Sequence, residues 1–222
     1  GMTYKAALAG LPLGGGKSVI IGNAKTIKTP ELMQAMGRAV AQMGGDYIIA
    51  EDVNTNVSDM EEIAKHTNSV VGLAAKEGHG AGDPSPLTAY GVFVGLKAAV
   101  KHRLGKEDIT GLKVLVQGLG HVGYTLCRHL HEAGAKLIVT DINNEVLDKA
   151  KEEFGATVVG LNDIYDVEAD VYAPCALGAT LNDETIARLK VAVVAGAANN
   201  QLKNVKHAAQ LMQRAILYAP DY

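Results

Sequence analysis

The sequence predicts an α/β protein in which helices cover both faces of a parallel sheet. From Lys113 onward, short apolar runs alternate with amphipathic segments of helical periodicity, which is the pattern of a parallel sheet between helix layers. Runs such as Val114-Leu115-Val116 carry no alternating polar residues, as expected for strands buried on both faces. With 222 residues, 48% of them hydrophobic, the chain can form one large domain or two modest ones.

The second half of the chain supplies most of the predicted elements. Ser85-Pro86 opens a long helix that continues to about Arg103. After it we expect strands at residues 114–116, 137–139, 170–173, 191–195 and 216–218, and helices at residues 121–133, 144–153, 182–189 and 204–214.

The first half is less regular. Thr29-Pro30 has the residues of a helix start, and Gly44-Gly45 ends the apolar repeat that follows. Tyr47–Ala50 has the composition of a buried strand. Ser58, followed three residues later by Glu61, matches a capping box and predicts another helix.

A glycine motif lies where the first strand after the long helix ends. Gly118-Leu119-Gly120-His121-Val122-Gly123 follows that strand and opens a helix, which is the context in which GxGxxG binds a dinucleotide pyrophosphate. Asp141 ends the next strand, about 20 residues further on, where a carboxylate would meet the ribose hydroxyls. The motif predicts a Rossmann-like, doubly wound domain and favours NAD over NADP, because Asp141 would repel a 2′-phosphate.

Composition changes between Gly72 and Pro86, where glycine, proline, serine and alanine predominate. We place a domain boundary there, between residues 1–80 and residues 81–222, and the glycine motif assigns the second segment to the NAD-binding domain.

Several classes of function are disfavoured. A net charge of −3 and the lack of a Lys/Arg-rich run argue against nucleic-acid binding. No apolar stretch reaches the roughly 18–20 residues of a membrane helix. Cys127 and Cys175 fit neither a disulfide framework nor a CxxC site, so reduced thiols are expected. His129 and His131 point to different sides of a helix, and no metal site is predicted.

The segment Gly14-Gly15-Gly16-Lys17-Ser18 resembles a phosphate-binding P-loop, but the spacing fails. That motif needs glycine at position 11, which is leucine here, so an NTPase is the weaker alternative. A lysine crowded by glycines and near a second cation, such as Lys5, is suited to proton transfer. Two surface lysines beside a flexible loop would be the plain structural interpretation.

Four motifs occur together and in order. They are Met2-Thr3-Tyr4-Lys5, Gly14-Gly15-Gly16-Lys17, Ala50-Glu51-Asp52-Val53 and the glycine motif at Gly118–Gly123. In this combination the chain resembles the glutamate/leucine/phenylalanine/valine dehydrogenase family over essentially its whole length. Further motifs are most similar to the leucine enzymes, at residues 83–86, 127–131, 140–143 and 173–178.

The resemblance implies roles for the matching residues. Lys17 matches the catalytic lysine that polarises the carbonyl of the intermediate and assists the attacking water. Asp52 matches the carboxylate that carries protons to and from the amine. Lys5 matches the lysine that grips the substrate carboxylate, and the other expected substrate-binding residues are Gly15, Ala50 and Asn200.

The cofactor set completes the expected site. Thr88, Cys175 and Ala176 fall on segments that line the nicotinamide half in the family. The full expected set of cofactor-binding residues is Thr88, Gly118, Leu119, Gly120, His121, Val122, Gly123, Asp141, Ile142, Cys175, Ala176 and Asn199.

The resemblance therefore implies NAD-dependent oxidative deamination of an apolar L-amino acid, leucine first, to the 2-oxo acid and ammonium. Gly196–Asn200 and Asp52–Asn56 look more like the phenylalanine enzymes, which leaves phenylalanine and valine as alternative substrates. A catalytically inactive NAD-binding fragment is the alternative from another class, and the joint presence of Lys5, Lys17 and Asp52 argues against it.

The same resemblance implies a homo-oligomer that acts on small molecules. The reduced thiols indicate a cytoplasmic protein, and the charge and hydropathy predict that it binds neither nucleic acid nor membrane. Family members continue before Gly1 and beyond Tyr222. We therefore expect this chain to be part of a longer protein, in which residues 1–80 form a truncated α/β substrate domain that carries the catalytic groups.

Overall fold

The computed structural model describes residues 1–74 and 83–222, which form two compact units. The sheet unit contains Gly1–Leu13 and Ser85–Tyr222, and the helical unit contains Gly14–Pro84. The expected domain boundary, between residues 80 and 81, lies outside the described residues. The first thirteen residues group with the sheet unit, which the sequence alone did not indicate.

The sheet unit contains six strands in the order β3-β2-β1-β4-β5-β6, and every neighbouring pair is parallel. The strands are β1 (Lys113–Gln117), β2 (Lys136–Thr140), β3 (Thr157–Val158), β4 (Val171–Pro174), β5 (Val193–Val194) and β6 (Leu217–Tyr218). This is the strand order of a doubly wound dinucleotide-binding fold, in which the order reverses beside the first strand. The predicted Rossmann-like fold is confirmed.

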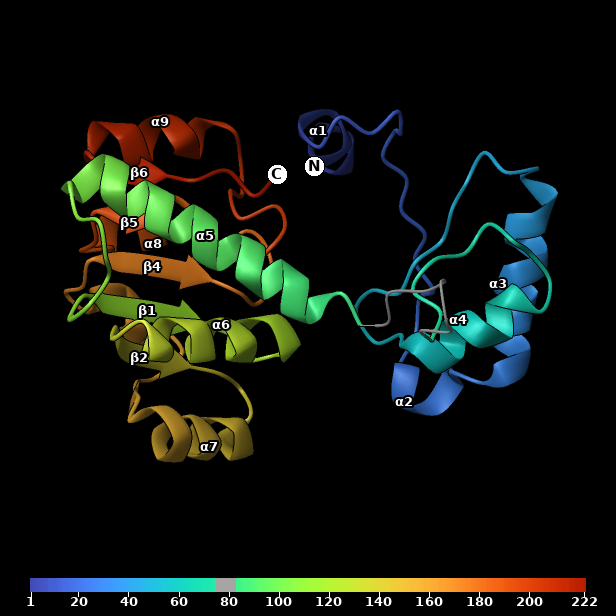
Figure 1. Cartoon of the computed structure of the whole chain (residues 1–222), viewed down its shortest axis with the longest axis horizontal. Coiled ribbons are helices and arrows are strands. Elements are labelled where there is room, and N and C mark those ends of the chain that lie inside the picture. The colour runs from blue at the N-terminus through green and yellow to red at the C-terminus, as the bar shows by residue number, and fades with distance from the viewer. Residues whose placement is uncertain (75–82) are drawn as a thin grey trace. The chain divides into compact units, whose positions relative to one another are not determined.

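Helices cover both faces of this sheet (Figure 1), and each face has its own core. Along β1, Val114 and Val116 face one core while Leu115 faces the other, because successive side chains point to opposite faces. The first core receives α5 (Ser85–Leu104), α6 (His121–Glu132) and α7 (Asn144–Phe154). The second receives the 3-10 helix η1 (Asp163–Asp166), α8 (Asp183–Arg188) and α9 (Lys206–Gln213). The remaining helix of this unit is α1 (Met2–Leu8).

The helical unit has a smaller core. Its helices are α2 (Ala24–Ile27), α3 (Pro30–Gln42) and α4 (Val57–Ala64). Thr29 begins α3 as predicted, since its side chain accepts a hydrogen bond from the Leu32 N–H. The buried apolar residues of the core are Met33, Val40, Ile49, Met60, Ile63 and Val70.

Two predictions for this unit were wrong in detail. Tyr47–Ala50 does not form a strand: Ile49 makes a single parallel bridge with Val70, and the Ile48 side chain is exposed. The capping residue of α4 is Asn56 rather than Ser58, and Asp59 completes its capping box. Both errors arise because local composition does not reveal which backbone groups find partners.

Candidate functional site

The glycine turn, Gly118–Gly123, begins where β1 ends. The Gly118 N–H donates to the Thr140 carbonyl (2.9 Å), and the Cys175 N–H donates to the Gln117 carbonyl (2.7 Å). Gly118 has a φ of 96°, and a Cβ there would lie 2.8 Å from Ala176. The neighbouring strands therefore hold the turn from both sides and leave no room for a side chain at its first glycine.

The other two glycines of the turn differ from each other. A Cβ on Gly123 would overlap the Gly118 carbonyl oxygen, so α6 can approach the turn only with glycine at this position. A Cβ on Gly120 would meet nothing within 4 Å. The protein itself does not require glycine at Gly120, whereas a pyrophosphate that approaches the backbone would. The close packing at Gly123 and the open space at Gly120 are therefore both what a dinucleotide-binding turn requires.

Asp141 lies at this turn. Its Oδ2 accepts the Leu119 N–H (2.6 Å) and its Oδ1 accepts the Asn143 N–H (2.8 Å), so the carboxylate is fixed beside the first glycines. Leu119 is buried in the first core, and the partly buried Val122 packs against that core. Ile142 is 86% exposed next to Asp141.

The loops after β4 and β5 also meet. Gly178 lies so close to Asn199 and Asn200 that a Cβ on it would be 2.6 Å and 2.8 Å from their carbonyl oxygens. The Ala179 N–H donates to the Asn200 carbonyl (2.8 Å), and Asn200 has a φ of 52°. These loops leave the carboxyl ends of parallel strands, where open α/β sheets bind ligands.

Lys5, from α1, reaches the same loop in the sheet unit. Its Nζ donates to the Asn199 Oδ1 (2.5 Å), so a residue expected at the substrate contacts one expected at the cofactor. The Asp221 Oδ2 accepts the Asn200 N–H (2.5 Å), and its Oδ1 accepts the Tyr218 hydroxyl (3.0 Å). Sequence analysis missed Asp221, because no spacing rule links it to Asn200. The exposed Lys5 ammonium can bind a carboxylate.

Cys175 and Thr88 complete the predicted cofactor set. Burial raises the pKa of the Cys175 thiol to about 11, so at neutral pH the group is a protonated thiol and not a nucleophile. Cys127 is also a free thiol, and burial raises its pKa further. Thr88 is exposed in the first turn of α5, while Ala176 is exposed after β4.

The helical unit brings Lys17 and Asp52 together. The Lys17 Nζ forms an ion pair with the Asp52 Oδ2, although the residues are far apart in the sequence and neither belongs to a helix or strand. Both side chains stay about half exposed, at 56% and 47%. Gly15 and Ala50, expected at the substrate, are exposed beside them in the sequence. A carboxylate and an ammonium side by side, both reachable from solvent, suit general acid–base chemistry.

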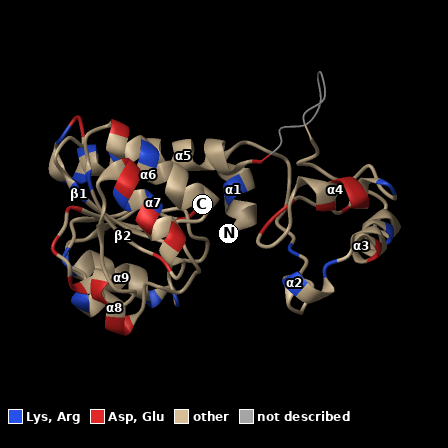
Figure 2. Ribbon diagram, turned by 90° about the horizontal axis from the view of Figure 1, so that it is seen from below, with Lys and Arg blue, Asp and Glu red and all other residues tan. Residues whose placement is uncertain are grey.

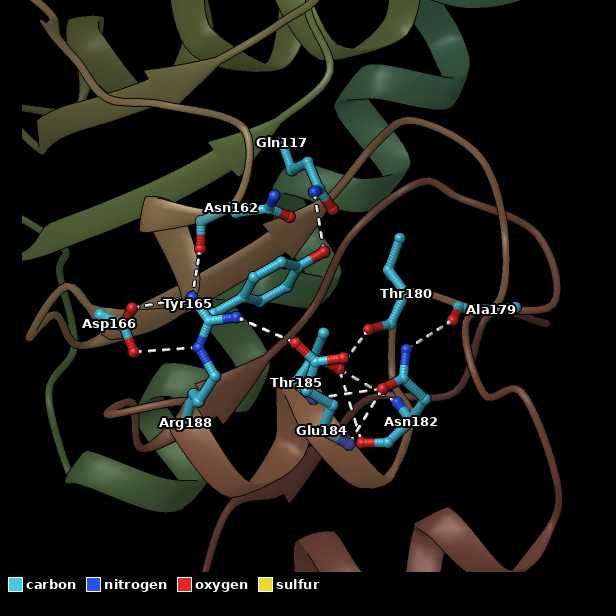
Figure 3. Close-up of polar contacts among 10 residues, drawn as sticks. All are labelled: Gln117, Asn162, Tyr165, Asp166, Ala179, Thr180, Asn182, Glu184, Thr185 and Arg188. Carbon is cyan, nitrogen blue, oxygen red and sulfur yellow. Dashed lines mark hydrogen bonds and ion pairs between the residues drawn. The ribbon is translucent and has the colours of Figure 1, made fainter.

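A buried polar cluster lies beneath the glycine turn and was not predicted. Gln117, the residue before Gly118, donates from Nε2 to the Tyr165 hydroxyl (2.9 Å) and accepts from the Tyr172 hydroxyl (2.5 Å). Figure 3 shows the Gln117–Tyr165 contact near the Arg188–Asp166 pair. Burial raises the pKa of Tyr172, which keeps its hydroxyl a hydrogen-bond donor. The only sequence signal was a polar residue at the end of an apolar strand.

The described residues show neither a metal-binding group of His, Cys, Asp and Glu nor a helix long and apolar enough to cross a membrane. His129 packs against the rings of Tyr90 and Phe93, and His131 packs against Phe154. Figure 2 shows acidic and basic residues interspersed over α6, α7 and α8.

Comparison with known proteins gives two matches to family models. Residues 1–69 match "Glu/Leu/Phe/Val dehydrogenase, dimerisation domain", and residues 80–151 match "Glutamate/Leucine/Phenylalanine/Valine dehydrogenase". The leucine dehydrogenase of Thermoactinomyces intermedius is 56% identical over the whole chain, which spans 60% of that protein. The phenylalanine dehydrogenase of Bacillus thermotolerans is 48% identical, and the chain spans 59% of it.

A solved structure agrees with these matches. The L-tryptophan dehydrogenase of Nostoc punctiforme aligns with a TM-score of 0.79 at 46% identity, covering 100% of this chain and 62% of that one. The chain therefore spans about three fifths of the length of the relatives it matches.

Proposed function

Because this chain belongs to the Glu/Leu/Phe/Val dehydrogenase family, we propose that it forms the working core of an NAD-dependent amino-acid dehydrogenase. The proposed reaction converts an L-amino acid, NAD⁺ and water into a 2-oxo acid, ammonium, NADH and a proton. Leucine is the first candidate substrate, and phenylalanine and valine are alternatives within the family. The observation that carries the proposal is the Lys17–Asp52 ion pair, since these two residues match the catalytic pair of the family.

Each residue has a distinct task in this proposal. Lys5 binds the substrate carboxylate through its ammonium, and Asn199 holds that ammonium in place. Asp52 accepts a proton from the substrate amine, and the Cα hydride would pass to a bound nicotinamide, which leaves an imine. Lys17 then assists the water that adds to the imino carbon, after which Asp52 returns a proton and ammonium leaves.

The glycine turn is the proposed site of the dinucleotide. Open space at Gly120 and the backbone N–H groups at the start of α6 suit a pyrophosphate. Asp141 favours NAD, because its carboxylate would accept ribose hydroxyls and repel a 2′-phosphate. Ala176, Cys175 and Thr88 are the proposed neighbours of the nicotinamide.

Two further proposals concern the assembly and the cellular location. The family model that matches residues 1–69 is described as a dimerisation domain, and we propose a homo-oligomer on that basis. A cytoplasmic location accords with the free thiols of Cys127 and Cys175.

The test is a substrate panel on the full-length protein. Leucine, isoleucine, valine, phenylalanine and tryptophan are each supplied with NAD⁺ or with NADP⁺, and reduced cofactor is followed by absorbance. We expect the highest kcat/KM for leucine with NAD⁺. A preference for an aromatic substrate would replace leucine but keep the reaction, and equal turnover with both cofactors would remove the role given to Asp141. Cofactor binding without turnover of any amino acid would favour the inactive NAD-binding alternative.

A further inference from the structure

The turn that carries Asp52 is closed by the side chain of Thr55. The Asp52 carbonyl accepts both the Thr55 N–H (2.9 Å) and the Thr55 hydroxyl (2.8 Å). The same hydroxyl accepts the Asp52 N–H (2.8 Å). One side chain therefore binds both backbone groups of Asp52, which is possible because a hydroxyl donates one hydrogen bond and accepts others.

Because Thr55 binds the backbone of Asp52, the Asp52 carboxylate is left to bind other groups. Its Oδ1 accepts the Val53 N–H (2.8 Å), and its Oδ2 meets Lys17. With the backbone of Asp52 held on both sides, the direction of its Cα–Cβ bond is fixed. The exposed carboxylate can then present Oδ2 to Lys17 without help from a packed core.

Asn54, in the middle of the turn, is held by Lys28, the residue that follows α2. Asn54 has a φ of 64°, a conformation that asparagine adopts more readily than most residues. The Lys28 Nζ donates to the Asn54 carbonyl (3.1 Å) and also pairs with Asp59 at 2.7 Å, at the start of α4. The turn is thus anchored at its middle as well as through Thr55.

We propose that Thr55 is a positioning residue for proton transfer: its hydroxyl holds Asp52 so that the carboxylate faces Lys17. This inference rests on the proposed function for its effect on turnover, and on the described contacts for its effect on the ion pair. Thr55 itself is not expected to touch the substrate.

Two variants of the full-length protein distinguish the effect of the Thr55 hydroxyl from the effect of its β-branched shape. Thr55→Val keeps the β-branched shape and removes both hydrogen bonds of the hydroxyl, whereas Thr55→Ser keeps the hydroxyl. Thr67→Val is the matched control. Thr67 is a half-buried threonine of the same unit whose hydroxyl also accepts a backbone N–H, that of Ser69 and not that of Asp52.

The first measurement does not depend on enzymatic activity. Acylation of Lys17 by a water-soluble reagent is followed by peptide mass spectrometry, because a carboxylate in contact with the ammonium shields it from the reagent. We expect Thr55→Val to raise the labelling rate about fivefold, the factor that corresponds to losing about one net hydrogen bond. Thr55→Ser and Thr67→Val should label like the wild type.

The second measurement is the split between kcat and KM. We expect Thr55→Val to lower kcat about tenfold to a hundredfold, because a displaced catalytic group costs rate steeply. The KM for the amino acid and the affinity for NADH should change by less than about twofold, since the substrate carboxylate and the cofactor are bound elsewhere. Thr55→Ser should retain most of the wild-type kcat. If Thr55→Val lost activity because the changed side-chain shape disturbed the fold, the serine variant would not be expected to retain it.

The outcomes distinguish this inference from the proposed function. Wild-type labelling of Lys17 in Thr55→Val, or a serine variant as impaired as the valine variant, overturns the positioning role. Altered labelling with an unchanged kcat also overturns it. If the wild type oxidises no amino acid, the proposed function fails, and the labelling comparison alone decides whether Thr55 holds Asp52 against Lys17.

Discussion

Two turns carry the proposed chemistry, and they are built in opposite ways. The glycine turn Gly118–Gly123 joins a central strand to a helix, and ladder hydrogen bonds from both neighbouring strands fix it. The turn at Asp52–Thr55 belongs to no sheet and is fixed by one hydroxyl and one ammonium. The first presents backbone groups, and the second presents a charged side chain.

The difference matches the task proposed for each turn. A pyrophosphate is recognised by a rigid row of backbone N–H groups, which a parallel sheet positions well. Proton transfer needs groups that solvent and substrate can reach, and Lys17 and Asp52 stay about half exposed. The comparison therefore predicts that substitutions at the second turn change turnover more than stability, and that those at the first turn do the reverse or weaken cofactor binding.

The largest effect is expected for Lys17→Ala. We expect kcat to fall about a hundredfold to ten-thousandfold, the usual contribution of a general acid–base group, while NADH binds as in the wild type. Stability should change little, because exposed ion pairs contribute about 0–1 kcal/mol. Steady-state kinetics and thermal unfolding test both points.

Lys65→Ala is the matched control for this variant. It removes a surface ion pair with Glu62 in the same unit, with a lysine of similar exposure (55%), and should leave turnover unchanged. Near-wild-type turnover of Lys17→Ala would exclude the proposed mechanism.

The sequence predicted these two turns with unequal success. Around Gly118 the strand and the helix each leave a pattern of apolar residues, and Asp141 lies at the spacing that the glycine motif predicts. The fold and the position of Asp141 therefore followed from local patterns. Lys17 and Asp52 were identified only by resemblance to a family. Their pairing depends on a turn whose partners, Thr55 and Lys28, have no spacing rule. Gln117 and Asp221 were missed for the same reason, because their partners come from distant strands and loops.

The next largest effect is a difference in stability between substitutions at two glycines of the same turn. Gly123→Ala should lower the free energy of unfolding by about 1–3 kcal/mol, because the new Cβ would overlap the Gly118 carbonyl. Gly120→Ala should stay within about 1 kcal/mol of the wild type, since space around it is open and only a cap preference is lost.

NADH affinity should separate the same two variants. Gly120→Ala should weaken NADH binding about tenfold or more without unfolding, because its methyl group would occupy the approach of the pyrophosphate. Denaturant unfolding and NADH titration of both variants test this. Undiminished NADH affinity in Gly120→Ala would mean that the open space does not receive the cofactor.

The smallest effect concerns the end of the Asp52 turn, where Asn56 begins α4. Asn56→Ala should lower the free energy of unfolding by about 1 kcal/mol, because the side chain caps the Asp59 N–H (3.1 Å) at the helix start. Ser58→Ala removes only an exposed hydrogen bond to Asn56 and should cost less than about 0.5 kcal/mol. Denaturant unfolding of both variants ranks them, and the reverse order would restore Ser58 as the capping residue. Because Asn56 directly follows Thr55, a loss of kcat in Asn56→Ala would show that the helix cap, and not only the threonine hydroxyl, holds Asp52 in place.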